Sequence, residues 1–434
     1  MKKDELKGPL RQEYDKKRGY GVMKLAAAGY QNIWFVIPPP PPRALPKGLP
    51  LKAMGRANAT LTRLPTFGEM SAIDKLINYF FVRREAVESS RIEGTWSTID
   101  SVLTPAEVFD TEQAKSENQS VKGYAHALEK QFNRAFEKKE KIFTGKLLCE
   151  IHKDIVSKDP SFKGTPGSLR QPGKPGSIVQ IGGSFRKEES TYNPTPPQHV
   201  RASLNEVLDW LSDEGLAQKG DAELAGFTLA VRLAIGHTHF EAVHPFPDGN
   251  GRVGRALWPL QMVCTDRMPL YLSGFVESQK AAYGKALQEA QKKLNYSPII
   301  EFVCEAVVQS EAEAKVTRAA IEGLPKRWKD RAKFRAGSAS ALALDVLLRK
   351  PVVTSVTLME ELKLSKQVVS TAINQLVERR IIRARGKVGR MNVYAAEELI
   401  ALLSREFGAN AEEALEAGYQ AIIKPEHSQT ASGH

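Results

Sequence analysis

Residues 244–255 read HPFPDGNGRVGR and bring a histidine, an aspartate, three glycines and two arginines into twelve positions. The glycines Gly249, Gly251 and Gly254 match the spacing G-x-G-x-x-G of a dinucleotide-binding turn. That interpretation requires a β-strand before the glycines and a βαβ unit around them, whereas His-Pro-Phe-Pro-Asp precedes them here. A P-loop is also excluded, because no Gly-Lys-Ser/Thr follows. The stretch therefore calls for a different chemistry.

The glycines and arginines lie where a loop is expected to become the N-terminus of a helix, RALWPLQMVC, which Pro259 should kink or break. Unpaired N–H groups and the helix dipole favour an anion there. Arg252 and Arg255 can both bind phosphate oxygens. Asp248 is the kind of ligand that Mg²⁺ takes beside substrate phosphates, and His244 can accept a proton from an attacking hydroxyl. The stretch predicts phosphoryl or nucleotidyl transfer to a hydroxyl.

A metal site built from His237, His239 and His244 is the alternative interpretation. Residues two apart on a helix point to different faces, so His237 and His239 cannot chelate one ion together. Packed or capping histidines are the better expectation for both.

Composition bounds the class of protein. The 434 residues predict two to four domains, and 42% hydrophobic with 26% charged residues is ordinary for a soluble globular protein. A net charge of +12 fits a nucleotide or nucleic-acid partner, and equally a solvated basic surface. Cys149, Cys264 and Cys304 predict free thiols in a reducing compartment. The N-terminus lacks a signal-peptide pattern and the apolar runs are short, which predicts a cytoplasmic protein without membrane contact.

The pattern along the chain predicts a mainly α-helical protein. Residues 1–112 form an N-terminal helical segment with a helix at about 71–94, and IPPPPPRALPKGLP before it favours a stiff connector over a proline-rich ligand. Residues 113–322 form a helical core. Within it, a glycine- and proline-rich region around the β-like island 177–181 predicts a hairpin.

The C-terminal part predicts a separate module. A basic linker at 323–337 precedes three helices and a β-hairpin at 338–403, which is the order of a winged helix-turn-helix. Thr357 and Glu360 predict a capping box, and 404–434 a frayed tail. The recognition helix would be Ser365–Arg380 and the wing Gly386–Gly389. The module's surface would bind DNA or, alternatively, dock protein or a second copy; it carries Lys366, Gln367, Arg379, Arg380, Arg383, Arg385, Lys387 and Arg390.

The stretch 244–255 resembles the signature of the Fic family, His-x-Phe-x-Asp/Glu-Gly-Asn-Gly-Arg-x-x-Arg, at every fixed position. PGSLR, SIVQIGG and YNPTPP resemble the region ahead of that signature, so the resemblance covers roughly 60–310. It implies a Fic-like helical bundle with a β-hairpin flap. The implied activity is that of a protein adenylyltransferase, which moves AMP from ATP to a Ser, Thr or Tyr hydroxyl of a target protein and of itself, releasing pyrophosphate.

The resemblance also assigns roles to residues. His244 would be the general base and Asp248 the Mg²⁺ ligand. A glycine at Gly251 favours AMP transfer over the kinase activity of members with lysine there, and leaves UMP or another nucleotide open. The target chain would add to the flap as a strand, at Ile178, Val179, Gln180 and Ile181. The ATP site would comprise Glu93, His244, Gly249, Asn250, Gly251, Arg252, Val253, Gly254, Arg255 and Tyr283.

The stretch SSRIEG places Ser89 and Glu93 four residues apart on one helix face, with Gly94 at the helix end. An ordinary capped helix end is one interpretation. The stretch also resembles the family's inhibitory motif, in which the Glu93 carboxylate would occupy Arg255 and displace the γ-phosphate. Two alternatives remain open: a hydrolase that removes AMP with Glu93, and a DNA-binding regulator whose core only senses nucleotide.

Overall fold

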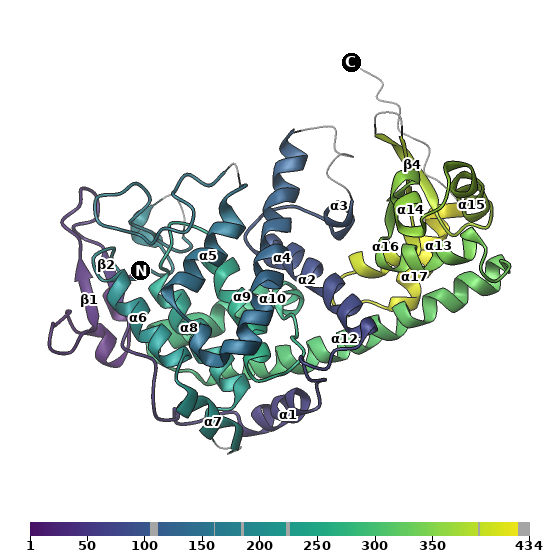
Figure 1. The fold of residues 1–434 in the computed structure, drawn as a ribbon. Coiled ribbons are helices and arrows are strands. Elements are labelled where there is room, and N and C mark those ends of the chain that lie inside the picture. Colours follow the sequence, from purple (N-terminus) through teal and green to yellow (C-terminus); the bar gives the residue numbers. More distant parts are fainter. Residues whose placement is uncertain (105–111, 160, 184–185, 223–225, 389–390, 424–434) are drawn as a thin grey trace. The chain divides into compact units, whose positions relative to one another are not determined.

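The computed structural model describes residues 1–104, 112–159, 161–183, 186–222, 226–388 and 391–423 (Figure 1). The chain divides into two compact units. Unit 1 comprises Met1–Trp96 and Gln119–Glu311, and unit 2 comprises Ser97–Asn118 and Ala312–His434. Two helices, α4 (Glu112–Lys138) and α12 (Ser297–Ala332), contribute residues to both units. The prediction of a mainly helical fold is confirmed.

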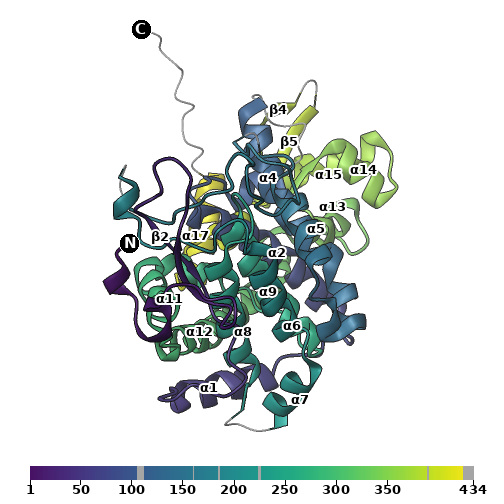
Figure 2. The same ribbon diagram turned by 90° about the vertical axis from the view of Figure 1, so that its left-hand side faces the viewer.

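Unit 1 is built around two consecutive helices, α8 (Leu229–Val243) and α9 (Asn250–Cys264), which pack against each other (Figure 2). Every residue of α8 is buried, and Gly251 is the one residue of α9 that is not. A helix that is covered on all sides belongs to the core, and here other helices supply the cover. The further elements of unit 1 are η1 (Lys3–Glu5), η2 (Gly8–Arg11), α1 (Leu51–Thr62), α2 (Ala72–Ile92), η4 (Lys139–Ile142), α5 (Gly145–Val156), η5 (Lys187–Glu189), α6 (Val200–Leu211), α7 (Glu214–Ala222), α10 (Ser273–Ser278) and α11 (Lys280–Lys293).

Helix α9 continues through Pro259, so the predicted break at this residue is wrong. Proline removes one helical hydrogen bond, the one that would reach the carbonyl of Arg255. Burial of Leu257, Trp258 and Leu260 on both sides of the proline stabilises the continuous helix.

The predicted helix at about 71–94 is confirmed as α2. Ser71 is its N-cap and forms a capping box with Asp74, and the helix ends where Glu93 is the C-cap. Gly94 follows with φ 87°, a left-handed conformation that suits glycine.

The N-terminal segment contains the short antiparallel pair β1 (Gly21–Lys24) and β2 (Trp34–Ile37). The island at 177–181 forms no strand in the described residues, and a single bridge joins Ile181 to Tyr192. The expected hairpin is thus reduced to one antiparallel bridge, because Gly182 and Gly183 take positive φ and turn the chain immediately after Ile181.

Unit 2 contains the three expected helices, α13 (Ala339–Arg349), α14 (Ser355–Leu362) and α15 (Lys366–Glu378), followed by the expected strands β4 (Arg383–Val388) and β5 (Met391–Ala395). A further strand, β3 (Val352–Thr354), lies between α13 and α14 and was not expected. The strands form an antiparallel sheet in the order β3-β5-β4. The capping box of α14 is formed by Thr354 and Thr357, not by Thr357 and Glu360, since the helix begins directly after β3. Gly389 and Arg390, in the expected wing, lie outside the described residues, as does the side chain of Lys387.

Two boundaries differ from those expected. The units separate inside α12, between Glu311 and Ala312, and the expected linker begins as helix, because α12 continues through Pro325 to Ala332. Trp328 holds this part of α12 in place, since it is buried and donates to the Glu398 carboxylate over 2.9 Å.

The expected frayed tail is also partly ordered. Unit 2 contains α3 (Ile99–Leu103), α16 (Glu397–Ser404) and α17 (Ala411–Ile423), and residues 411–423 of the tail form the last of these. A Cβ at Gly418 would lie 2.6 Å from the carbonyl oxygen of Glu397, so a glycine permits α17 to approach α16 closely.

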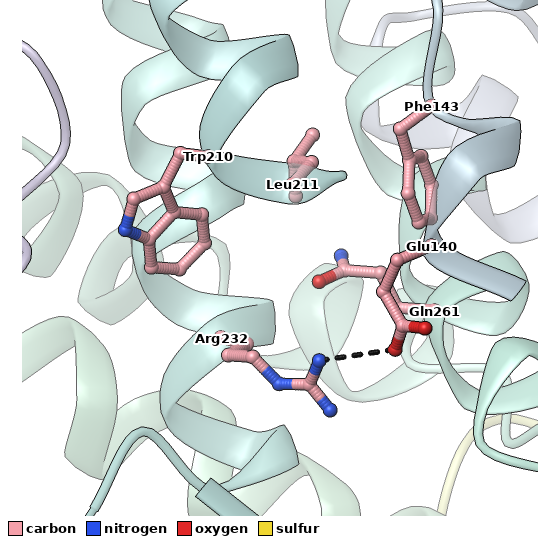
Figure 3. Close-up of a pocket in the computed structure, with 6 residues that line it drawn as sticks. All are labelled: Glu140, Phe143, Trp210, Leu211, Arg232 and Gln261. Atoms are coloured by element: carbon pink, nitrogen blue, oxygen red, sulfur yellow. Dashed lines mark hydrogen bonds and ion pairs between the residues drawn. The ribbon is translucent and has the colours of Figure 1, made fainter. Parts of the chain in front are cut away.

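A small pocket in unit 1 surrounds the ion pair between Arg232 and Glu140, whose Nη1 and Oε1 are 3.2 Å apart (Figure 3). Phe143, Trp210 and Leu211 also line it, and it leaves no room for a water molecule. This is interior packing.

No helix among the described residues combines the length and apolar character needed to cross a membrane.

The histidines of α8 are packed, as expected. His237 accepts or donates one hydrogen bond with the Tyr283 hydroxyl at 2.6 Å, and His239 one with the Tyr296 hydroxyl at 2.8 Å. Burial lowers the pKa of His237 to about 4 and that of His239 to about 3. Both imidazoles are therefore neutral in the folded protein.

These lowered pKa values predict acid sensitivity. Below pH ~6.5 the unfolded chain binds protons at His239 that the folded chain does not, so the free energy of unfolding falls as the pH drops toward 3. Between pH 7 and 5 we expect His239 to account for a loss of about 2 kcal/mol. Urea unfolding of His239→Gln at both pH values should show a correspondingly smaller loss. The exposed His126→Gln is the control and should keep the full loss; an equal loss in both variants would contradict the prediction.

Candidate anion and proton-transfer site

The loop between α8 and α9, residues 244–249, is closed by one side chain. Asn250 is the first residue of α9, and its amide accepts from the Phe246 N–H and donates to the Phe246 carbonyl, each over 2.8 Å. His244 begins the loop with φ 51° and Gly249 ends it with φ 76°. A histidine in this left-handed region is uncommon, and such strain is typical of functional sites. Asn250 thus holds the loop in shape. The signature predicted Asn250 only as part of the ATP site and gave no indication of this structural role.

A histidine that sequence analysis did not single out supports the same loop. His152 on α5 stacks on Phe246, which is fully buried, with ring centroids 3.9 Å apart. Its Nδ1 accepts from the Gly167 N–H, so Nε2 carries the proton and donates to the Asp248 carbonyl over 3.1 Å. Burial lowers the pKa of His152 to about 4, which keeps this tautomer neutral.

A buried arginine fixes the start of the loop. Arg170, within the stretch PGSLR, donates to the carbonyls of His244 and Val243 at 2.7 and 2.9 Å and to those of Ser177 and Thr195 at 2.9 and 2.8 Å. Burial lowers the pKa of Arg170 to about 9. A cation at the C-terminus of α8 meets the negative end of the helix dipole and so stabilises the turn into His244.

The N-terminus of α9 is an anion site. Its N-cap, Gly249, offers no side-chain acceptor, so the first N–H groups of the helix lack a capping partner. Gly251 lies in this first turn, and a Cβ there would collide with the Glu93 carboxylate and approach Arg255 to 2.8 Å. A carboxylate therefore already lies against the helix terminus, where the positive end of the dipole favours it.

Glu93 and Ser89, from the end of α2, both bind Arg255. The Glu93 Oε1 accepts from Nη2 of Arg255 over 2.7 Å. Ser89 accepts from Arg255 twice, at Oγ over 2.8 Å and at its carbonyl over 2.9 Å. Arg255 is almost fully buried; burial alone would lower its pKa, but Glu93 and neighbouring groups raise it. The structure thus brings together the two segments that the sequence could only relate by resemblance.

The two arginines of the loop diverge. Arg252 is buried and directs Nη1 to Ser120 Oγ at 3.3 Å and to Asp159 Oδ2 at 3.4 Å. Although residues three apart are neighbours on a helix surface, Arg252 and Arg255 bind different partners and do not converge on one point in this structure.

Three further residues expected at the ATP site are buried in helix packing. Val253 is fully buried, and a Cβ at Gly254 would meet Glu241 and Phe240 of α8. The Tyr283 hydroxyl binds His237, although Tyr283 also lies close enough to Arg255 for their charges to interact.

Asp248 fits a Mg²⁺ site of the kind that substrate phosphates complete. It is exposed, and its Oδ1 accepts from the Gly249 N–H over 2.5 Å. Across the described ranges no three His, Cys, Asp or Glu side chains cluster as metal ligands. One carboxylate beside an anion site suffices for Mg²⁺, which commonly binds one or two carboxylates, water and phosphates.

The expected flap lies next to a surface cavity. Ile178, Val179 and Gln180 belong to no strand or bridge, and Gln180 Nε2 donates to Asn193 and Ser190. The cavity has a volume of about 460 Å³ and shares Pro247 with the loop; its lining also includes Lys163, Thr165, Ser168, Arg170, Gln171, Lys174 and Ser177.

These features define a helical protein with a histidine, a carboxylate and a helix-terminus anion site on one loop. Residues 142–262 match the Fic/DOC family and residues 51–133 match the N-terminal region of that family. The chain thus contains a Fic/DOC domain and the N-terminal region of that family, as the signature indicated.

Two curated relatives are protein adenylyltransferases by name. A probable protein adenylyltransferase of Aquifex aeolicus is 27% identical over 180 residues, which cover 39% of this chain and 48% of the relative. The protein adenylyltransferase fic-1 of Caenorhabditis elegans is 34% identical over 121 residues, which cover 28% of this chain and 21% of the relative. This chain therefore spans about half or less of the length of these relatives.

Solved structures are similar as well. A Fic family protein from Desulfovibrio desulfuricans has a TM-score of 0.47 at 18% identity, over 82% of this chain and 98% of that one. Fic-1 of C. elegans has a TM-score of 0.44 at 20% identity, over 61% and 69%.

Proposed function

We propose that this protein transfers AMP from ATP to a hydroxyl of a target protein, and of itself, and that Glu93 restrains the reaction. The observation that carries the proposal is the position of His244 on the same short loop as an uncapped helix N-terminus. A base and an anion site so close together suit an attack on phosphorus by a hydroxyl. The names of the curated relatives support AMP as the transferred group.

The reaction follows from these positions. The target hydroxyl loses its proton to Nε2 of His244, its oxygen bonds to the α-phosphorus, and the bond to pyrophosphate breaks. The N–H groups of Gly251 and its neighbours at the start of α9 hold phosphate oxygens, and Arg255 binds the γ-phosphate once Glu93 leaves it. Mg²⁺ at Asp248 would neutralise charge on the phosphates.

The surface beside the loop supports a protein substrate. Residues 178–180 belong to no strand or bridge, so their backbone is available to an incoming strand, and Ile181 already pairs with one antiparallel partner, Tyr192. The adjacent cavity has room for a side chain of the target. The free thiols of Cys149, Cys264 and Cys304 agree with a cytoplasmic location, which is part of the proposal.

For the C-terminal module we propose a winged helix that docks protein in preference to DNA. Two of its expected DNA-binding arginines are used internally: Arg383 and Arg385 both bind the Glu397 carboxylate, and Arg385 also binds Asp100. The exposed face of α15 carries Val368, which is 43% exposed, so this face is partly apolar.

His244→Ala should abolish transfer and leave ATP binding nearly unchanged, because the loop and the helix terminus remain. Loss of a general base typically lowers a rate by ~10²–10⁴. Incorporation of labelled AMP and calorimetric ATP binding measure the two effects. Undiminished incorporation would remove His244 from the mechanism.

Glu93→Gly should raise self-modification by about 10² or more, since it frees Arg255 for the γ-phosphate and lets the α-phosphate align. Ser89→Ala is the matched control: Ser89 holds Arg255, not Glu93, so its loss should not activate. Arg255→Ala should be inactive with or without Glu93. If wild type and Glu93→Gly incorporate AMP equally, Glu93 is only the residue that ends a helix. If wild type removes AMP from the modified protein faster than Glu93→Gly does, the protein is a hydrolase that uses Glu93.

Duplex DNA should bind the chain weakly, because Arg383 and Arg385 are engaged by Glu397 and the exposed face of α15 is partly apolar. Fluorescence anisotropy with a labelled duplex at 50 and 200 mM salt tests this. Tight binding that weakens ~10³-fold or more over that range would show extensive phosphate contacts and favour the DNA-binding regulator instead.

A further inference from the structure

A buried carboxylate lies behind His244. Glu241 is one helical turn before His244 on α8, is 6% exposed, and its Oε2 is 3.6 Å from the His244 Nδ1. Its other oxygen, Oε1, has no hydrogen-bond partner in the described part of the chain, and the same holds for His244 Nδ1. A buried carboxylate oxygen without a hydrogen-bond partner is costly, so the position of Glu241 requires an explanation.

Both core helices make room for this carboxylate. A Cβ at Gly254 of α9 would lie 2.5 Å from Glu241 Oε1 and 3.0 Å from the Phe240 ring. The third glycine of the loop sequence thus faces α8, and any larger residue there would displace Glu241. Gly254 contributes to the site by leaving space for an anion of the protein itself.

The surroundings of Glu241 keep it charged. Burial alone would raise the pKa of Glu241, but the contact with His244 and the positive charge of Arg255 act against burial, and the pKa lies below its usual value. His237 of α8 and Tyr283 of α11 are the further titratable groups that face it. At neutral pH the nearest ring nitrogen of His244 therefore faces a full negative charge.

We propose that Glu241 is a positioning residue for His244: its carboxylate favours the tautomer with the proton on Nδ1 and so leaves Nε2 free to accept the proton of the target hydroxyl. This inference rests on the proposed function. When Nε2 takes that proton, the resulting imidazolium carries positive charge opposite the carboxylate, and the 3.6 Å separation shortens to a hydrogen bond, as such contacts do when substrate is bound.

The tautomer of His244 tests the inference without any turnover. Nitrogen-15 NMR of histidine-labelled full-length protein, with the His244 signal assigned by its loss in His244→Ala, should show Nδ1 protonated. In Glu241→Gln the His244 pKa should fall, because an opposite charge is removed, and the tautomer preference should weaken. Glu322→Gln, on the exposed face of α12, is the control and should change neither. An unchanged pKa and tautomer in Glu241→Gln would overturn the inference.

The rate gives the second measurement, in the Glu93→Gly background. Glu241→Gln should lower kcat for AMP incorporation about 10²-fold with KM for ATP unchanged, and move the midpoint of the pH–rate profile down. Glu241→Asp should recover part of the rate. If Glu241→Gln does not fold, the NMR measurement of His244 is made on Glu241→Asp instead. If the parent transfers no AMP but the His244 pKa still depends on Glu241, the proposed function fails and the positioning role stands.

Discussion

The two hydrogen bonds between the Asn250 side chain and the backbone of Phe246 fix the geometry on which the rest of the site depends. They hold a six-residue loop between two buried helices, with left-handed residues at both ends. His152 and Arg170 then attach to that loop from outside, one through the Asp248 carbonyl and the other through the carbonyls that end α8. Because every polar side chain in this set binds backbone, the loop conformation does not require a nucleotide to form it. Such preorganisation lets binding free energy act on the reacting groups instead of on ordering the loop.

The two arginines of the loop sequence, Arg252 and Arg255, bind different partners, although their spacing predicted that both would bind phosphate. Arg255 faces α2 and Arg252 faces Asp159, so only the former lies next to the carboxylate at the helix terminus. In this structure Arg252 links α9 to Ser120 and Asp159 and does not bind the same group as Arg255. The same division applies to the glycines: Gly249 permits a left-handed N-cap, Gly251 leaves the helix terminus open, and Gly254 faces the neighbouring helix.

Sequence patterns predicted what is local and missed what is formed across the fold. The loop, the start of α9 and the boundaries of α2 were predictable, because the residues that form each of them are contiguous. The contact of Glu93 with Arg255 was inferred by resemblance alone, since 162 residues separate the two. His152 carries no local signal. Arg170 lies in PGSLR, which the resemblance covers, but nothing in the sequence shows that either side chain binds carbonyls. The wrong break at Pro259 and the early end expected for α12 have one cause: burial of apolar and aromatic side chains overrides the local cost of a proline.

The restraint proposed for Glu93 would act by occupying Arg255 and the helix terminus, not by forming a strong bond. Its side chain is 39% exposed, whereas that of Arg255 is 2% exposed, and a partly exposed ion pair contributes little net free energy. Because Glu93 belongs to the same chain, its effective concentration at the helix terminus is high, and a nucleotide phosphate must compete with it. Glu93 is the last residue before a left-handed glycine, so it can leave the site without unwinding α2. Arg255, in contrast, stays fixed by both oxygens of Ser89. A phosphate that replaces the carboxylate therefore meets an arginine already in position, and the exchange requires movement of one side chain only.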